Sequence, residues 1–495
     1  MFALFKDPSG PAFGRFWLGQ AFSLLGSAVT TFALGFWFYQ QTGQATPIYL
    51  TALAQFLPRV LLGLPAGVIA DRLNPKMLMI VSDLAQAAIT AVMFALLLGG
   101  QLEPIIIYLL IAVKSAVGVF QEAAEPLIIS RLMPQHLMGQ AFGLGNAQYG
   151  SASLLGPVLG GVLVAVWGLP GVLAADMASF VFGALMTATL RLKPVVADAG
   201  PNESDLSEPK KPRGMIADAK EGFGWLRNQP GLIGLMITFG MFNFMLTFTS
   251  RLVTPLVLSR TGQDVTALGF VAAAFGLGNL LGGLLLGATG SPKRKVVTVL
   301  VGMALAGFFE QVVMGLGRSP WVWMLANFVG GFLVPYYESA NFELYQSKTP
   351  AALLGRVLSA KSLVARAMVP LSFGAAGVFA DRLFEPAMNG PLGLQFQPLL
   401  GDGPGRGYAL MMLIFGTLTV LVSLSGFLRP PLVILENIAD ANQPEPSEAS
   451  PGASTDDSAA VLDPFTTLEF VWEYQDPSAE DFDPNGMGAT LPRES

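Results

Sequence analysis

Seven polar or charged side chains stand inside long apolar stretches of this sequence, and they are the residues best placed to do chemistry. They are Arg59, Lys114, Gln121, Glu122, Glu125, Glu310 and Glu338. A charge near the centre of a lipid bilayer costs on the order of 2.5 kcal/mol or more, so such charges favour ion, proton or substrate pathways. A carboxyl group there can release and regain a proton as a cation approaches and leaves it. We therefore predict a pathway for a small-molecule substrate and for protons, with interhelical ion pairs that only lock the fold as the alternative.

The spacing of these residues predicts which of them meet. Gln121 and Glu125 lie seven and eleven residues after Lys114, so the three share one face of a helix, with Glu122 beside them. Arg59 stands in the middle of its own apolar segment, too deep for its side chain to reach water easily. We expect the two carboxylates to face inward, where Lys114 and Arg59 supply the cations.

Other charges lie nearer the ends of apolar segments. There an ion pair, or a side chain that extends to the membrane interface, is enough to accommodate the charge. These residues are Asp83, Asp176, Arg251, Glu343, Lys361 and Arg366.

Enzyme chemistry finds little support in the residue types. The chain has no cysteine and a single histidine, His136, which argues against disulfides, thiolate chemistry, a histidine metal site and a histidine-based triad. No constellation of nucleophile, metal ligands or cofactor-binding residues stands out. We expect no enzymatic activity, no metal, no cofactor and no nucleic-acid partner.

The composition requires a membrane. Of the 495 residues, 52% are hydrophobic and only 13% are charged, too apolar for a soluble globular domain. A helix of roughly 20 apolar residues crosses a bilayer core of about 30 Å. Segments of that kind predict an all-α polytopic protein with twelve transmembrane helices, the first of them retained and not cleaved as a signal. They lie near residues 15–39, 47–70, 77–98, 104–129, 139–166, 169–190, 231–258, 265–288, 296–316, 320–345, 356–380 and 408–428.

The connections between these segments alternate in charge. The even-numbered connections hold fifteen Lys and Arg residues, and the odd-numbered ones hold four. Because basic loops stay on the cytoplasmic side, this alternation predicts a multi-pass protein of the cell (inner) membrane with both termini in the cytoplasm.

Two halves of the chain repeat each other. Glu122-Ala-Ala-Glu125 recurs as Glu338-Ser-Ala-Asn341, an offset of 216 residues, and the proline and glycine that follow recur at the same offset. This predicts two six-helix halves, as in secondary transporters. The predicted divisions are residues 1–191, a cytoplasmic linker over 192–230 with a short amphipathic helix, residues 231–429, and an acidic, disordered cytoplasmic tail over 430–495.

A charged turn between the second and third segments contains Gly67, Asp71, Arg72 and Lys76. We expect Gly67 to let a neighbouring helix approach closely. Asp71 and Arg72 are placed to pair with each other, with helix ends or with the other half of the molecule, and so to act on conformation. A plain topology signal is the alternative for this turn.

The fifth segment carries glycines at helical spacing together with a proline: Gly150, Gly156, Pro157, Gly160 and Gly161. The small residues predict tight helix contact, and the proline removes one backbone hydrogen bond and bends the helix.

These motifs resemble the major facilitator superfamily over residues 10 to about 430. The resemblance rests on Ser23-Leu-Leu-Gly26-Ser27, on the 67–76 turn, and on the glycines of the fifth segment, which are similar to the antiporter signature of its drug-efflux branches. The second half departs from the pattern, because Ser291–Lys295 lacks the Asp-Arg pair. Within the superfamily, the motifs resemble the macrolide-efflux and enterobactin-exporter-like group.

The resemblance implies a secondary active transporter that exports amphipathic or hydrophobic small molecules, by alternating access and proton-coupled antiport. Two alternatives stay open: a lysophospholipid or lipid flippase of the same fold, and a non-transporting membrane sensor. The acidic tail would solubilise the chain or dock a cytoplasmic partner.

Overall fold

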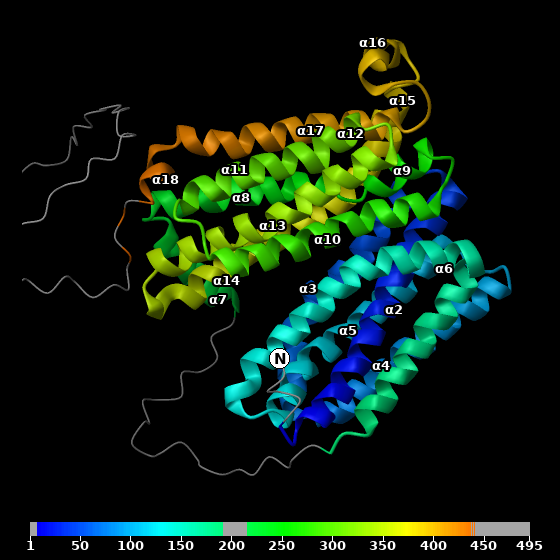
Figure 1. Ribbon diagram of the computed structural model, residues 1–495, viewed down its shortest axis with the longest axis vertical. Coiled ribbons are helices and arrows are strands. Elements are labelled where there is room, and N and C mark those ends of the chain that lie inside the picture. The colour runs from blue at the N-terminus through cyan, green and yellow to red at the C-terminus, as the bar shows by residue number, and fades with distance from the viewer. Residues whose placement is uncertain (1–6, 192–214, 437, 439, 441–495) are drawn as a thin grey trace, which may run out of the picture. The chain divides into compact units, whose positions relative to one another are not determined.

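The protein is described by a computed structural model over residues 7–191, 215–436, 438 and 440 (Figure 1). These residues fold as helices joined by turns, without a β-strand, and they belong to one compact unit. The predicted all-α membrane fold is therefore confirmed. The first part of the linker and the acidic tail beyond residue 440 lie outside the described residues, so the predictions for them stay predictions.

The first half of the chain forms long helices, several of which begin with proline, whose fixed φ angle suits the first helical turn. Their bounds are α2 Gly10–Thr42, α3 Thr46–Arg72, α4 Pro75–Leu98, α5 Pro104–Leu132, the 3₁₀ turn η1 Gln135–Leu137, and α6 Met138–Ala188.

The second half follows the same plan, with more interruptions. Its elements are α7 Met215–Leu226, α8 Pro230–Thr249, α9 Val253–Arg260, α10 Val265–Thr289, α11 Lys295–Gly307, η3 Phe308–Val313, α12 Met314–Leu316, α13 Pro320–Lys348, α14 Ala351–Phe379, η4 Ala380–Phe384, α15 Glu385–Ala387, α16 Pro391–Leu400, α17 Arg406–Ser425, η5 Gly426–Leu428 and α18 Pro430–Ile434. Elements η3 and η4 are π-helical.

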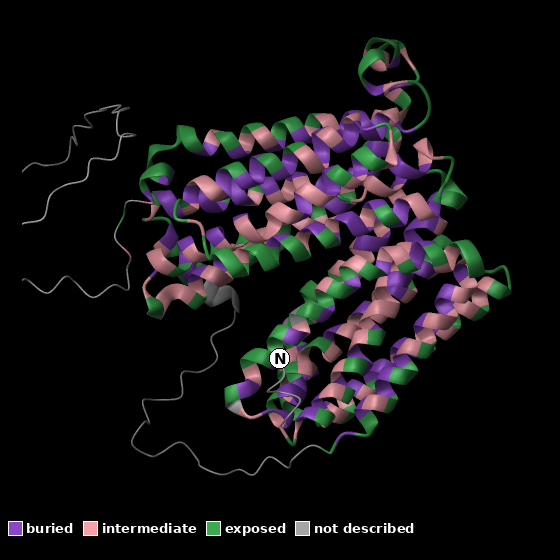
Figure 2. Ribbon diagram, viewed as in Figure 1, coloured by how far each residue is buried: buried purple, intermediate pink, exposed green. Residues whose placement is uncertain are grey.

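All twelve predicted apolar segments fall in helical parts of the structure. By length and composition, nine helices of the described residues are able to cross a membrane, or ten if the bent α3 is counted as one span. Many large apolar side chains of these helices are exposed, among them Leu61, Leu284 and Trp321, each more than 60%. Figure 2 shows exposed positions along the helices of both halves. A surface this apolar needs lipid around it. The count of twelve spans itself stays a prediction.

Helix α6 contains two of the predicted segments and reverses between them. Its break is Gly168, whose φ of 62° favours glycine. Before the break, Gly156 lies on Ala28 of α2, and after it Ser179 lies against Gly26 of the same helix. Both parts of α6 therefore run along α2, in opposite directions.

The internal repeat appears in the element bounds. Helices α5 and α13 are both 29 residues long, and their first and last residues differ by the predicted offset of 216. Helices α2 to α6 pack mainly on one another, as do α8 to α17, and the two groups meet through α6 with α10 and α3 with α14 (Figure 1). We call these groups the first and second bundles.

Glycine permits the closest contact between the bundles. A Cβ atom on Gly161 of α6 would lie 3.0 Å from the carbonyl oxygen of Val265, and one on Gly276 of α10 would lie 2.8 Å from the backbone of Leu154. Larger side chains there would push the two helices apart.

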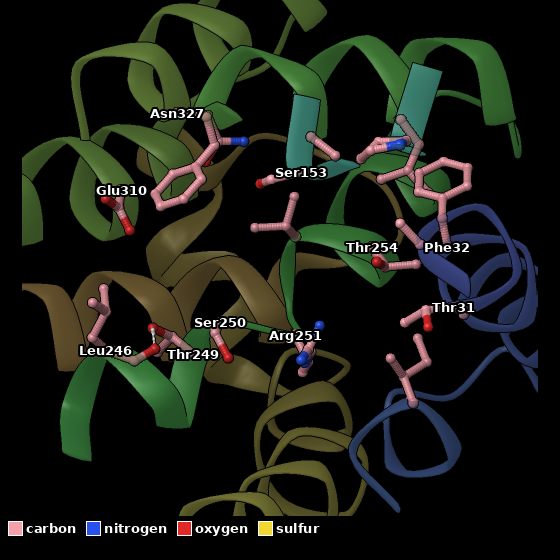
Figure 3. A pocket seen from close by; sticks show the side chains of 18 of the residues that line it. Thr31, Phe32, Ser153, Leu246, Thr249, Ser250, Arg251, Thr254, Glu310 and Asn327 are labelled. Atoms are coloured by element: carbon pink, nitrogen blue, oxygen red, sulfur yellow. Dashed lines mark hydrogen bonds between the residues drawn. The ribbon is translucent and has the colours of Figure 1, made fainter. Parts of the chain in front are cut away.

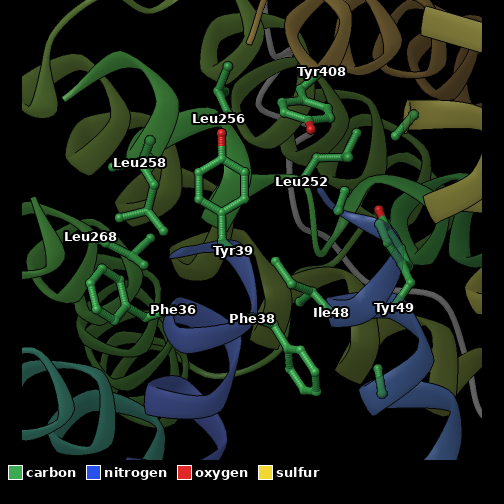
Figure 4. Packing of buried hydrophobic residues seen from close by; sticks show 14 of the residues in the cluster. Phe36, Phe38, Tyr39, Ile48, Tyr49, Leu252, Leu256, Leu258, Leu268 and Tyr408 are labelled. Carbon is green, nitrogen blue, oxygen red and sulfur yellow. The ribbon is translucent and has the colours of Figure 1, made fainter. Parts of the chain in front are cut away.

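The bundles are sealed together at the end that carries the turns 43–45 and 261–264, which we call the far end. Tyr49 of α3 and Leu252, beside α9, are fully buried there in a cluster that also takes side chains from α2, α10 and α17 (Figure 4). The hydroxyl of Tyr49 donates a hydrogen bond of 2.6 Å to the carbonyl oxygen of Phe248 across the interface. The opposite end carries the basic turns that include 73–74 and 290–294, and we call it the basic end.

Asp381 of η4 also joins the bundles at the far end. Its carboxylate accepts hydrogen bonds from the backbone N–H groups of Ala45 and Thr46, at 2.9 and 2.7 Å, and from the Thr46 hydroxyl at 2.6 Å. The hydroxyl of Tyr408 donates to the same carboxylate at 3.1 Å. One side chain of the second bundle thus pairs with N–H groups at the start of α3 that have no partner within the helix.

A helix, α7, lies in the part of the linker where the sequence predicts an amphipathic helix, and it packs on α14. A Cβ on Gly222 would lie 2.2 Å from the carbonyl oxygen of Arg356, so the two backbones touch. The guanidinium of Arg356 pairs with Glu221 at 2.5 Å.

We predict that Asp381→Ala loosens the far end, because hydrogen bonds to a charged group contribute about 1.5–3 kcal/mol each and several are lost together. The chain has no native cysteine, so Thr254→Cys, in the cavity described below, provides a single reporter. An impermeant maleimide on the far-end side should label it several times faster in the Asp381→Ala background. Arg382→Ala, at the exposed neighbouring position, is the control. Equal labelling rates in both backgrounds would show that Asp381 does not hold this end closed.

Candidate functional site

A cavity of about 630 Å³ lies between the two bundles (Figure 3). Apolar side chains such as Phe32, Leu246 and Phe275 form much of its wall. Its polar lining comes from Ser27, Thr31, Arg59, Ser153, Thr249, Ser250, Arg251, Thr254, Glu310, Gln311 and Asn327. Both bundles contribute, so relative movement of the bundles changes the site.

Glu310 enters this cavity from η3, the π-helical turn that interrupts its span. It fits because α13 has a glycine opposite: a Cβ on Gly330 would lie 2.1 Å from the Glu310 side chain. The Oε1 atom of Glu310 is buried and has no hydrogen-bond partner among the described residues. π-helical turns are often found at functional sites, because they turn a side chain away from the regular helical face.

Arg251 lines the same cavity from the break between α8 and α9. Its guanidinium lies over the ring of Phe373, 5.6 Å from the centroid. The Nε atom is buried and has no hydrogen-bond partner in the described part of the chain. The sequence placed Arg251 near a helix end, where its side chain could reach the membrane interface. The structure places it inside the protein, at an interrupted span.

Two amides hold the helices around Glu310 in place. Gln311 donates hydrogen bonds to the Thr249 hydroxyl at 2.8 Å and to a carbonyl of α8, and accepts one from Thr419. Asn327 donates to the carbonyl oxygen of Val271 at 3.0 Å. Gln311 therefore ties η3 to α8 and α17, and Asn327 ties α13 to α10.

Arg59 pairs with Glu122, as expected from the sequence. Arg59 Nη2 lies 3.1 Å from Glu122 Oε1, and the two side chains are 56% and 46% exposed. Both residues, with Glu125 and Tyr149, line a smaller chamber of about 120 Å³ in the first bundle. Leu24, Ser27 and Arg59 also line the central cavity, and Arg59 is the charged residue that the two spaces share.

Lys114 has a different partner from the one expected. It pairs with Asp176 at 2.5 Å, and Asp176 is fully buried. The hydroxyl of Thr90 donates to the same carboxylate at 3.0 Å. The sequence assigned Asp176 to the end of a segment and proposed Glu122 and Glu125 as the carboxylates near Lys114. In the structure α4 packs on both α5 and α6, and this arrangement brings Asp176 to Lys114.

Gln121 points inward, as its position on α5 predicts, and belongs to a buried polar network. Its side-chain amide donates to Asp83 at 2.7 Å and to the carbonyl oxygen of the Gln20 side chain at 2.8 Å. Gln86 donates to the Gln121 oxygen in turn. Asp83, which the sequence placed near a helix end, is fully buried at the centre of this network.

Glu338 does not join the site, although it repeats Glu122 in the second half. It is exposed and lines none of the three cavities that surround Arg59. Lys361 is the charged residue that interacts electrostatically with Glu338. The ammonium of Lys361 itself lies 4.9 Å from the ring centroid of Tyr345.

The basic-end turn makes one firm contact. The ammonium of Lys76 donates to the carbonyl oxygens of Ala188 and Leu190, at 2.8 and 2.7 Å. These groups close the end of α6, where a cation is favourable.

The rest of this turn is unengaged. Asp71 and Arg72 are exposed, and their side chains form no hydrogen bond or ion pair with the other described residues. No atom lies within 4 Å of where a Cβ on Gly67 would stand, so the close helix approach predicted there is not present.

The glycine-rich part of α6 is a packing surface, as predicted. Gly156 and Gly160 lie against α2, while Pro157 and Gly161 lie against α10 of the other bundle, and the Pro157 carbonyl is 2.7 Å from the Cβ position of Gly269. Gly150 is different, because nothing lies within 4 Å of its Cβ position.

No cluster of three or more metal-ligating side chains occurs in the described ranges. The residues that sequence reasoning missed are Arg251, Asp83, Asp176 and Asn327. The first three are charged residues that the sequence analysis noted. Their distance from the end of an apolar segment, however, did not predict how deeply they are buried in the protein. Asn327, a lone amide in an apolar segment, carried a weak signal that a buried polar group needs a partner.

Comparisons with known proteins agree with this architecture. The family model described as Major Facilitator Superfamily matches residues 16–375. Macrolide efflux protein A of Streptococcus pyogenes is 24% identical over 372 residues, which is 75% of this chain and 90% of the relative. Multidrug efflux pump Tap of Mycolicibacterium fortuitum is 25% identical over 362 residues, 72% of this chain and 86% of the relative.

Solved structures share the fold. A bacterial homolog of the human lysosomal transporter Spinster, inward-facing and unoccupied, superposes with a TM-score of 0.63 at 14% identity, over 87% of this chain and 98% of that one. A bacterial homologue of the iron transporter ferroportin, also inward-facing, gives a TM-score of 0.56 at 13% identity, over 83% of this chain and 98% of that one.

We predict that the two ion pairs of the first bundle differ in their effect on stability. Removing one partner of a buried pair costs about 3–5 kcal/mol, so Asp176→Ala should lower the melting temperature strongly. An exposed pair contributes at most about 1 kcal/mol, so Glu122→Gln should change it little. Thermal unfolding of purified protein measures both. In the double variant Lys114→Met with Asp176→Leu no charge is left unpaired, so it should recover much of the loss; a double variant as unstable as Asp176→Ala would show that the ion pair is not what matters.

Proposed function

The chain belongs to the major facilitator superfamily, and from this premise we propose that it is a transporter, and not an enzyme, which exports amphipathic or hydrophobic small molecules by alternating access coupled to protons. The observation that carries the proposal is the central cavity, which has an apolar wall with a few polar groups and lies between two bundles sealed together at one end. Sites of this kind take small organic ligands. The macrolide and multidrug efflux relatives support the direction of transport.

The basic end is the cytoplasmic end in this proposal, and the protein lies in the cell membrane with both termini in the cytoplasm. The far-end seal, with Asp381 bound to the start of α3, then closes the outer side. Asp71 and Arg72, unengaged in this conformation, find partners when the basic end closes.

Coupling is assigned to the chamber that contains Glu122 and Glu125. Arg59 lines both this chamber and the central cavity, so a ligand that draws Arg59 away changes the charge balance of the chamber. A carboxyl group gains a proton more readily when its cation leaves, and releases it when the cation returns. Substrate and proton thus act on the same side chain.

The proposal is tested with the full chain in liposomes whose lumen is acidic. Protein molecules inserted with the basic end outward should carry a macrolide and a hydrophobic dye into the lumen. A protonophore should abolish this accumulation. Absence of flux for substrates of this class, with the protein inserted and folded, would favour a sensor over a transporter.

We predict that Glu122→Gln or Glu125→Gln abolishes uphill, pH-driven accumulation and preserves downhill exchange of substrate, because a glutamine cannot carry the proton. Arg59→Ala should impair both, because it removes the charged group that lines both spaces. Flux with and without a pH gradient measures this. If both glutamine variants still accumulate substrate with normal pH dependence, the pair is structural and coupling belongs to Glu310 or Glu338.

We predict a different result for the basic-end turn. Asp71→Asn should reduce flux and leave substrate affinity nearly unchanged, because residue 71 does not line the cavity and acts on the conformational equilibrium alone. Binding titration and flux on the same preparation separate the two effects. A large loss of affinity with normal cycling would contradict this role.

A further inference from the structure

The central cavity contains two opposite charges that do not pair with each other. Glu310 and Arg251 both line it, and neither forms an ion pair within 4 Å with a described residue. Arg59 is the third charge of the lining, and it is paired with Glu122. The second bundle thus presents one carboxyl and one guanidinium group to the cavity, both without an ion-pair partner among the described residues.

Both charges stand where a helix is interrupted. Glu310 is on the π-helical turn η3, and Arg251 is in the break between α8 and α9. Interrupted helices near the middle of a transporter commonly form ligand sites, because the interruption turns polar groups toward the cavity. Figure 3 shows the two side chains on different walls around the same space.

Contacts fix the two side chains without neutralising them. The Glu310 side chain lies over Gly330, where any larger residue would displace it. The Arg251 guanidinium lies over the Phe373 ring, which holds it by a weaker attraction than a carboxylate would. A buried charge without a partner costs free energy. A ligand that supplies both partners recovers this free energy when it binds.

Apolar side chains form much of the rest of the cavity wall. Phe32, Leu246, Leu268, Phe275 and Met412 line the cavity. They would hold an alkyl or aromatic body, with Met412 adapting to its shape.

We propose that the cavity binds an amphipathic zwitterion, whose cationic group pairs with Glu310, whose anionic group pairs with Arg251, and whose apolar body lies on the aromatic and aliphatic wall. The inference rests on the proposed function and narrows its substrate class. The anion is a phosphate, as in a lipid headgroup, or a carboxylate, as in a soluble metabolite.

The test uses ligands that share one tail. The full chain carrying Thr254→Cys is purified in dodecyl maltoside, and protection of this cavity residue from maleimide reports occupancy. The ligands are dodecylphosphocholine, N-dodecyl-N,N-dimethylglycine, dodecyltrimethylammonium and dodecyl phosphate. Either zwitterion should protect at a concentration about tenfold lower than the singly charged ligands, as expected for one additional charge-assisted hydrogen bond. Stronger protection by the first indicates a phosphate-bearing lipid, and by the second a carboxylate metabolite.

Variants assign each charge. Arg251→Gln should raise the half-protection concentration of the zwitterions about tenfold and leave the cationic ligand unchanged. Glu310→Gln should weaken the zwitterions and the cationic ligand and spare the anionic one. Arg251→Lys retains the charge, so it should keep most of the protection and shows that position 251 tolerates change. Arg382→Gln and Glu103→Gln, both exposed and outside the cavity, are matched controls.

Equal protection by the cationic ligand and the zwitterions, unaffected by Arg251→Gln, would overturn the inference in favour of a cation site. Equal protection by all four ligands, unaffected by either variant, would also overturn it and would leave the proposed export of amphiphiles standing. Protection by none of them would remove support from the proposed function as well.

Discussion

The structure depends on the cost of an unpaired charge in a medium that water does not reach. The first bundle meets this cost internally: Lys114 neutralises Asp176, and Gln121 with Gln20 surrounds Asp83. The second bundle leaves Glu310 and Arg251 facing the cavity. The two halves repeat each other in helix length and register, yet they distribute polarity differently. The first buries Lys114 and Asp176 as an ion pair, and the second leaves Glu310 and Arg251 available to a ligand.

Interruptions in the helices create that difference. A regular helix presents one face to its neighbours, and a charge on that face becomes buried against them. The π-helical turn η3 and the break after α8 release Glu310 and Arg251 from this regular arrangement. Gly168 has a comparable effect at the level of the fold, because it allows α6 to reverse along α2. Irregular backbone is tolerated at membrane depth where protein or a cavity surrounds it.

Close packing at the far end joins the two bundles at a contact about which they can move relative to each other. Gly161 and Gly269 bring α6 and α10 into backbone contact, and a buried aromatic and aliphatic cluster fills the end beyond them. Such packed surfaces have discrete arrangements and do not deform continuously. The exposed Asp71 and Arg72 at the basic end fit a molecule in which one end is sealed while the other is free.

The sequence by itself determined the helices, their order and the repeat, because long apolar segments, turn residues and a constant offset of 216 are local or periodic signals. It also identified Arg59, Glu122 and Glu310 as deep charges. Only the tertiary structure decided which charges pair. Lys114 pairs with Asp176 and not with Glu122, which is nearer in the sequence. Periodicity gives the face on which a side chain lies. Which of several neighbouring helices that face meets depends on packing among residues far apart in the chain, and the interruption that turns Arg251 into the cavity has no counterpart in hydropathy.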